Sequence, residues 1–250
     1  MIPMSNFEKN FRFEGREEYN ENYKKNRAIR MVICIAILAA LAIILCFLRF
    51  KPPLVSSMFM IDFSIIPELI AAIAYGPVAG VIICFLRYVV HIAVLPNSFI
   101  PDVASFIIDL VYLIFVGVFY KSRLFYNKEK NYDDRYKKEK SFFACSMLAS
   151  LPSLIFQFFL TEFFTFPMLE KHYEKSGVNY DSIISEYSHT VDAIRQYVSE
   201  FTAKLIPNIN AIWQGILVIN LPITFGKYVI ATLFVMIIYR YISPFLHYAR

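Results

Sequence analysis

The sequence predicts an all-α membrane protein with six transmembrane helices, of which the second is short. Of its 250 residues, 58% are hydrophobic and only 18% are charged, and the mean hydropathy is +0.50. These values lie well outside the usual composition of a soluble domain. Apolar runs long enough to cross a membrane occupy roughly 29–48, 78–95, 103–120, 142–166 and 216–239, and a shorter run covers 63–76.

The first apolar run follows a polar stretch, 1–28, that we expect to form a cytoplasmic tail. No small-residue cleavage site follows this run, so we expect it to remain as an anchor rather than to be removed as a signal peptide. Together with the later runs it forms a predicted six-helix membrane domain over 29–245.

The second run is the shortest of the six. Counted from Ile61 to Gly76, it would rise about 24 Å as a helix, which is less than the ~30 Å hydrocarbon core of a bilayer. It also carries Asp62 and Glu68. A tilted helix or a locally thinned bilayer would still allow it to cross.

The distribution of Lys and Arg predicts the orientation. Seven of the 25 lie in 1–30, eight in 121–140 and two from Arg240 onwards. Cytoplasmic flanks collect positive charge, so both termini and the 121–140 loop are predicted to be cytoplasmic, where this loop would contact anionic lipid or dock a partner. The N-terminus and the 121–140 loop can lie on the same side only if the second run also crosses the membrane. The segment 167–214 is then a long external loop between the fifth and sixth helices, and its amphipathic part, Tyr180 to Leu205, is a candidate lid.

Sequence motifs do not indicate catalysis. The four cysteines lie in apolar runs without metal-ligand spacing, and the chain has no Gly-rich phosphate loop, HExxH motif or Ser/His/Asp arrangement. We therefore expect no disulfide, metal, cofactor or enzyme activity. The energy for any transport would come from an ion gradient or from another subunit.

Polar residues recur at helical spacing in four of the predicted spans. On the fourth, Asp102, Ser105, Asp109 and Tyr112 follow one another at intervals of three, four and three residues, which places them on one stripe of a helix. In the predicted orientation the four polar stripes converge on the outer half of the membrane, where they would suit a planar polar solute. The candidate ligand-binding residues are Lys227, Thr224, Asn220, Thr161, Glu162, Ser105, Asp109 and Arg87.

An alternative role for the charged members of this set is structural pairing. We favour a pair between Arg87 and Asp109, and Lys227 with Glu162 is the second such candidate. For Lys227 a ligand contact is favoured, because an ammonium group on a helix interrupted by Pro222 offers three donors to carbonyl acceptors.

The first apolar run places Ala36 and Ala40 four residues apart. This small-xxx-small spacing allows another helix to approach closely, and it also arises by chance in Ala-rich helices. The two alanines are therefore a candidate partner interface.

Two stretches of the sequence resemble a known family. These are IDFSIIPELIAAIAYGPVAG, residues 61–80, and LPITFGKYVIATLFVMIIYRYISPFLH, residues 221–247. They are similar to the second helix and the C-terminal end of the substrate-binding S components of energy-coupling factor (ECF) vitamin transporters, most closely the riboflavin-type members. The resemblance covers about 29–245 apart from the external loop.

The resemblance implies six helices with both termini inside, in the plasma membrane of a bacterium. It implies that the chain binds a vitamin from outside, and that Ala36 and Ala40 contact a transmembrane T component, which works with two ATPase subunits. It also places Asp62 and Ser64 as caps of a short second helix beside a gating loop, 49–62, with Glu68 in the first turn of that helix.

This sequence departs from the riboflavin-type pattern in its candidate pocket. The departures are Thr161, Thr224 and Ser105 where riboflavin-type members have Asn, Asp109 in place of a Gly, and Arg87 and Tyr88 in place of a Lys-Asn pair. An amide both donates and accepts hydrogen bonds, whereas a hydroxyl is shorter and carries one proton. These replacements could therefore redirect the site to another vitamin or heterocycle.

The function predicted is therefore that of the specificity subunit of an ECF-type importer for riboflavin or a related flavin. The alternatives are an S component for a different vitamin, a membrane scaffold without transport function, and proton-driven transport through Asp109 and Glu162.

Overall fold

The computed structural model describes residues 6–50, 61–95, 99–121, 135–173, 179–198 and 206–248. Within these ranges the regular structure is helical, apart from one antiparallel bridge between Phe50 and Ile61. The helices are α1 (Asn6–Phe47), α2 (Ile65–Ala74), α3 (Pro77–Val94), α4 (Phe99–Lys121), α5 (Arg135–Leu160), η2 (Thr161–Thr165), α6 (Phe166–Tyr173), α7 (Tyr180–Arg195), α9 (Ile212–Gly215), η4 (Ile216–Asn220) and α10 (Leu221–Tyr248).

Five helical stretches of the described chain are long and apolar enough to cross a membrane: Lys25–Phe47, Pro77–Val94, Phe99–Tyr120, Phe142–His172 and Ile212–Tyr239. They agree with the five long runs predicted from the sequence, and most of their ends differ from the predicted ends by only a few residues. The fourth continues past the predicted 166 because α5, η2 and α6 follow one another without a break.

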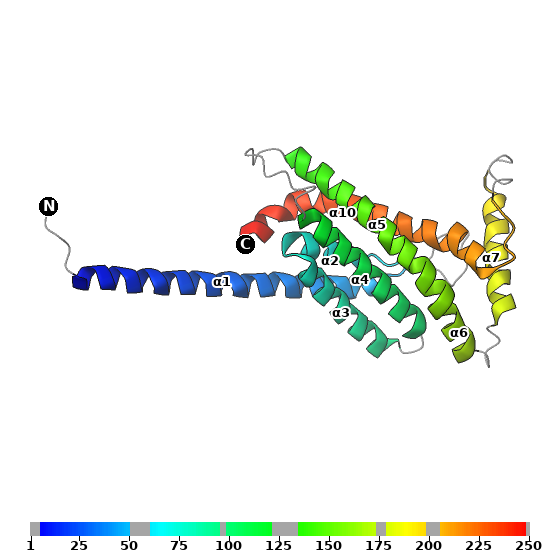
Figure 1. The fold of residues 1–250 in the computed structure, drawn as a ribbon, viewed down its shortest axis with the longest axis horizontal. Helices are drawn as coiled ribbons and strands as arrows, with labels where there is room; N and C mark the ends of the chain where they lie inside the picture. The colour runs from blue at the N-terminus through cyan, green and yellow to red at the C-terminus, as the bar shows by residue number, and fades with distance from the viewer. Residues whose placement is uncertain are drawn as a thin grey trace.

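Helix α1 is longer than its membrane stretch. It begins at Asn6, so that much of the polar tail predicted over 1–28 continues the first apolar helix. Figure 1 shows this N-terminal part of α1 projecting away from the other helices.

Helix α2 is the core of the bundle. All ten of its residues are buried, and it packs against α1, α3, α4 and α10. At 1.5 Å per residue, ten residues rise about 15 Å, roughly half of a bilayer core. A helix of this length tolerates Glu68 because its neighbours, rather than lipid, surround it.

Two glycines of the 61–80 stretch allow α2 and α3 to pack closely. Gly76 adopts a φ of 105° between the two helices, a conformation that favours glycine. At Gly80, a Cβ atom would lie 2.9 Å from the Cβ of Ala72 and 3.0 Å from the carbonyl oxygen of Glu68. The motif GPVAG therefore makes the tight turn and the close helix contact.

The start of α2 differs in part from the expected cap. Ser64 occupies the N-cap position, but its side chain does not cap the helix. Its backbone N–H donates to Asp62 Oδ1 at 3.2 Å, and its hydroxyl donates to the same oxygen. Glu68 lies in the first turn, as expected.

A polar cluster joins the ends of α1, α3 and α4. His91 Nδ1 lies 2.8 Å from Asp102 Oδ2, and Arg49 donates to Asp102 Oδ1 at 3.1 Å and also contacts the His91 ring. The ring of Phe47 stacks on His91 with centroids 5.5 Å apart. Asp102 therefore serves helix packing rather than the polar pocket described next.

Candidate ligand-binding pocket

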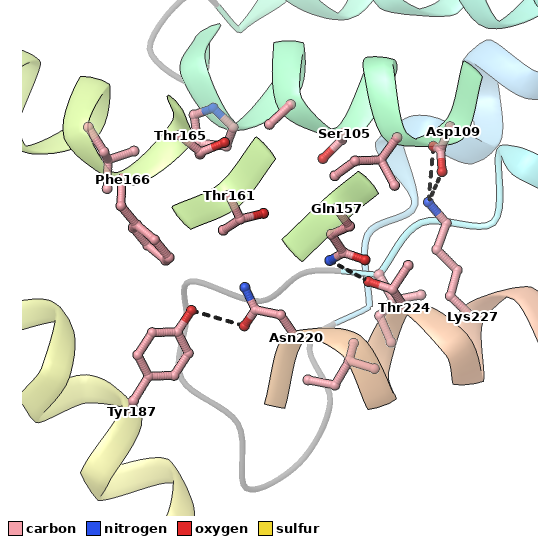
Figure 2. Close-up of a pocket in the computed structure, with 16 residues that line it drawn as sticks. Ser105, Asp109, Gln157, Thr161, Thr165, Phe166, Tyr187, Asn220, Thr224 and Lys227 are labelled. Carbon is pink, nitrogen blue, oxygen red and sulfur yellow. Dashed lines mark hydrogen bonds and ion pairs between the residues drawn. The ribbon is translucent and has the colours of Figure 1, made fainter. Parts of the chain in front are cut away.

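A pocket of about 220 Å³ lies between helices that are far apart in the sequence. It is lined by residues of α4, α5, η2, α6, α7, η4 and α10, together with Ile61. Its polar side chains are Ser105, Asp109, Gln157, Thr161, Thr165, Tyr187, Asn220, Thr224 and Lys227 (Figure 2). Few polar groups converging in an otherwise apolar cleft are typical of a small-molecule site.

Six of the eight predicted ligand-binding residues line this pocket: Ser105, Asp109, Thr161, Asn220, Thr224 and Lys227. The other two, Arg87 and Glu162, do not line it. Arg87 is buried behind Asp109, with its Nη2 donating to Asp109 Oδ2 at 3.2 Å. This ion pair is the structural pair that the sequence favoured.

Lys227 pairs with a different acid from the one proposed. Its ammonium nitrogen lies 3.2 Å from Asp109 Oδ1 and 3.1 Å from Asp109 Oδ2, so the proposed pair with Glu162 is wrong. Glu162 does not line the pocket, and its buried Oε2 has no hydrogen-bond partner within the described residues. Lys227 therefore has Asp109 as its carboxylate partner.

Arg87 and Lys227 lie among three carboxylates. Besides Asp109, Arg87 Nε is 2.6 Å from Glu68 Oε1, and Arg87 Nη1 is 3.9 Å from Asp62 Oδ2. The carboxylate of Asp62 also accepts hydrogen bonds from the backbone N–H and the hydroxyl of Ser64. Asp62 and Glu68, the two acids of the 61–80 stretch, therefore compensate the buried positive charge of Arg87.

Gln157 presents an unused acceptor to the pocket. Its Nε2 donates to Thr224 Oγ1 at 2.9 Å, whereas its buried Oε1 has no hydrogen-bond partner within the described part of the chain. A buried carbonyl oxygen without a donor is costly. A ligand N–H or O–H group would satisfy it.

Tyr187 reaches the pocket from α7, and its hydroxyl donates to Asn220 Oδ1 at 3.0 Å. Its ring meets Phe166 edge to face, with centroids 6.1 Å apart. Neither Tyr187 nor Thr165 was among the residues predicted from the sequence. The spacing of four between Ile183, Tyr187 and Val191 on an amphipathic helix was the available signal for Tyr187.

Two π-helical segments, η2 and η4, contribute to the pocket wall. They supply Thr161 and Thr165 on one side and Asn220 on the other. A π-helical turn rotates the residues that follow it relative to an α-helix, and such turns are frequent at functional sites.

The predicted partner alanines lie on the outside of the bundle. Ala36 and Ala40 are exposed on α1, whereas Ala39 and Ala42 face the core. The exposed side also carries Ile33, Ile37 and Ile44.

The family model of the substrate-specific component of ECF transporters matches residues 30–245. The chain belongs to this family and is a multi-pass membrane protein.

Two individual proteins illustrate the relationship. The chain is 28% identical over 109 residues to the riboflavin transporter RibU of Staphylococcus aureus (strain TCH60), and the match covers 44% of this chain and 55% of that protein. The chain thus spans about half the length of this curated relative. A solved structure described as "Structure and mechanism of the S component of a bacterial ECF transporter" shares the fold, with a TM-score of 0.58 and 21% identity over 88% of this chain and 98% of the solved chain.

Proposed function

We propose that the pocket binds a vitamin of the flavin type, most directly riboflavin, and that the chain delivers it for uptake as the specificity subunit of an ECF importer. The observation that carries this proposal is the convergence of six sequence-selected polar residues on one pocket in a member of this family. The similarity to RibU supports riboflavin as the first ligand to test.

The lining of the pocket suits a planar heterocycle with a polar edge. Phe166 and Tyr187 offer aromatic surface, and Ile108, Ile223 and Leu169 offer apolar walls. The amides and hydroxyls can donate to ring carbonyls and accept from ring N–H groups. The threonines at 161 and 224 replace amides of the riboflavin-type pattern, and the nearby Gln157 and Asn220 supply amide groups to the same pocket.

The ion pair between Asp109 and Lys227 favours an uncharged ligand. The positive charge of Lys227 is already matched by a carboxylate at 3.1 Å. An anionic ligand group would have to compete with Asp109 for this ammonium group, and a cationic group would have to compete with Lys227 for the carboxylate.

The orientation proposed from the basic residues accounts for entry of the ligand. In this orientation both termini lie in the cytoplasm, and the 61–76 segment that contains the short helix α2 crosses within the bundle. The pocket then opens toward the outer side, and the segment 167–214 lies outside. The 29–245 region is then the membrane domain, and the 121–140 loop and the polar tail are cytoplasmic.

Uptake requires energy that this chain is not expected to provide, since its role is binding rather than catalysis. We propose that a transmembrane T component and two ATPase subunits supply it. The exposed side of α1 around Ala36 and Ala40 is the docking surface, because small side chains let a partner helix approach closely.

The decisive experiment is purification in mild detergent, followed by denaturation and measurement of flavin absorbance and fluorescence. The protein is then titrated with riboflavin, alongside Thr161→Val and Thr224→Val, which remove pocket hydroxyls at nearly constant volume. Thr190→Val on α7 is the matched control, because Thr190 lies outside the pocket lining and its hydroxyl donates to the carbonyl oxygen of Glu186 at 2.9 Å.

Bound flavin or saturable binding that both pocket variants weaken supports the proposal. A wild-type protein that neither retains flavin nor binds riboflavin would reject riboflavin and direct the search to other vitamins. Binding that is unchanged in both pocket variants would reject this pocket as the site.

A further inference from the structure

Helix α7, which the proposed topology places outside the membrane, is not a free surface helix. Ile183, Tyr187 and Val191 recur every four residues and are 1%, 1% and 2% exposed. They pack in a second hydrophobic core together with Ile100, Phe166, Leu169, Ile209, Ile212, Ile216 and Ile219. These three residues therefore fix α7 against the membrane domain.

Polar contacts and one glycine fix the position of α7. Ser188 Oγ donates to the carbonyl oxygen of Ile209 at 3.2 Å, and Arg195 Nη2 donates to that of Ile206 at 2.7 Å. At Gly215, a Cβ atom would lie 2.5 Å from the ring of Tyr187. The ring of Tyr187 therefore occupies space that only a glycine leaves open.

This position aims the hydroxyl of Tyr187 at the amide of Asn220. The O–H group donates to Asn220 Oδ1 at 3.0 Å. Burial raises the pKa of Tyr187, so the phenol keeps its proton at neutral pH and remains a donor. Figure 2 shows the amide oxygen of Asn220 turned toward Tyr187 and the amide nitrogen turned toward Thr161, across the pocket.

While the oxygen of Asn220 is turned toward Tyr187, the amide presents its N–H₂ group, with two donors, to the other side. Without Tyr187 the amide could rotate by 180° and present an acceptor or a donor at similar cost. The contact therefore makes Asn220 a hydrogen-bond donor, rather than an acceptor, at this edge of the pocket.

We propose that Tyr187 is a positioning residue that fixes the carboxamide of Asn220 so that its N–H₂ group meets a carbonyl acceptor of the ligand. The external helix α7 thereby takes part in substrate selection. This inference rests on the proposed function, because the ligand it concerns is the one bound in this pocket.

The test is a double-mutant cycle of Tyr187→Phe and Asn220→Ala, read by riboflavin titration. Loss of one oriented hydrogen bond corresponds to a roughly 3- to 10-fold weaker affinity in Tyr187→Phe. Because Tyr187 acts through Asn220, Tyr187→Phe should have no further effect in the Asn220→Ala background. Tyr180→Phe, on the same helix but 44% exposed, is the matched control and should bind normally.

Unchanged affinity in Tyr187→Phe overturns the inference, and so do independent effects that multiply in the double variant, since these indicate a merely structural role. If the wild-type protein does not bind riboflavin, the proposed ligand fails instead. The same variants are then compared by thermal unfolding without ligand. Coupling between positions 187 and 220 upholds the contact, whereas independent effects overturn it.

Discussion

The carboxylate of Asp109 accepts from Lys227 at 3.1 Å and from Arg87 at 3.2 Å, so that one acid on α4 joins a cation of the pocket wall to a cation of the core. Asp109 is 2% exposed. This arrangement couples the stability of the bundle to the chemistry of the pocket, and variants can separate the two.

Lys227→Ala should lower both stability and binding. Removal of one partner of a buried ion pair leaves the other charge uncompensated, which costs about 3 kcal/mol. Because Arg87 still contacts Asp109 in this variant, we expect the loss of stability not to exceed this value. Thermal unfolding in detergent measures the stability, and ligand titration measures the affinity.

The double variant Lys227→Ala with Asp109→Ala separates the two effects. It removes both charges of the pair, so part of the stability lost in Lys227→Ala should return, although the contacts of Asp109 with Arg87 and Tyr228 stay lost, and ligand affinity should stay low. Full recovery of affinity would show that Lys227 serves only to balance Asp109.

Asp109→Asn should change the charge preference of the pocket. Without the carboxylate, the ammonium of Lys227 is available to an anionic ligand group. We expect the affinity for riboflavin 5′-phosphate to rise relative to riboflavin by about 5-fold, which corresponds to roughly 1 kcal/mol. Competition titrations of the two flavins measure this ratio, and an unchanged ratio would contradict the assignment of Asp109 as a selectivity residue.

Gln157→Leu should weaken binding without weakening the fold. The variant removes a buried carbonyl oxygen that has no partner in the described structure, but it also removes the N–H group that donates to Thr224; these effects oppose each other, so the free energy of unfolding should change by less than about 1 kcal/mol. Ligand affinity should fall roughly 10-fold if the ligand donates to this oxygen. A matched Gln214→Leu variant, in α9 and outside the pocket lining, should bind normally.

Gly80→Ala should destabilise the bundle. The added Cβ would meet the Cβ of Ala72 at 2.9 Å and push α2 away from α3, a repacking that costs about 1 to 3 kcal/mol. Gly226→Ala is the matched control, because a Cβ there has nothing within 4 Å and improves helix propensity by up to ~1 kcal/mol. Equal melting temperatures for the two variants would contradict close packing at Gly80.

Ala36→Leu combined with Ala40→Leu should leave ligand binding intact and abolish uptake in cells that contain the ATPase module. Both residues are exposed on α1, so the larger side chains do not disturb the bundle but keep a partner helix at a distance. Ala93→Leu with Ala144→Leu is a matched control at exposed positions on α3 and α5. Normal uptake in the Ala36/Ala40 variant would remove this surface from the docking model.

Hydropathy and spacing alone predicted much of this protein. Runs of apolar residues are a local property, so the five long helices and the short α2 were predictable. The 3.6-residue period is also local, and it placed Ser105 and Asp109 on one stripe of α4 that does line the pocket. A resemblance carried by only a few motif residues was sufficient to indicate the family.

The sequence did not determine which stripes face one another. Lys227 meets Asp109 rather than Glu162, and Tyr187 of α7 reaches Asn220 although 33 residues separate them. These partners depend on helix rotation, on the π-helical turns at η2 and η4 and on the close packing that Gly80 and Gly215 permit. The sequence by itself determined the helices and their polar stripes, because both follow from local chemistry. Only the tertiary structure decided the pairings, because they result from how all the helices pack together.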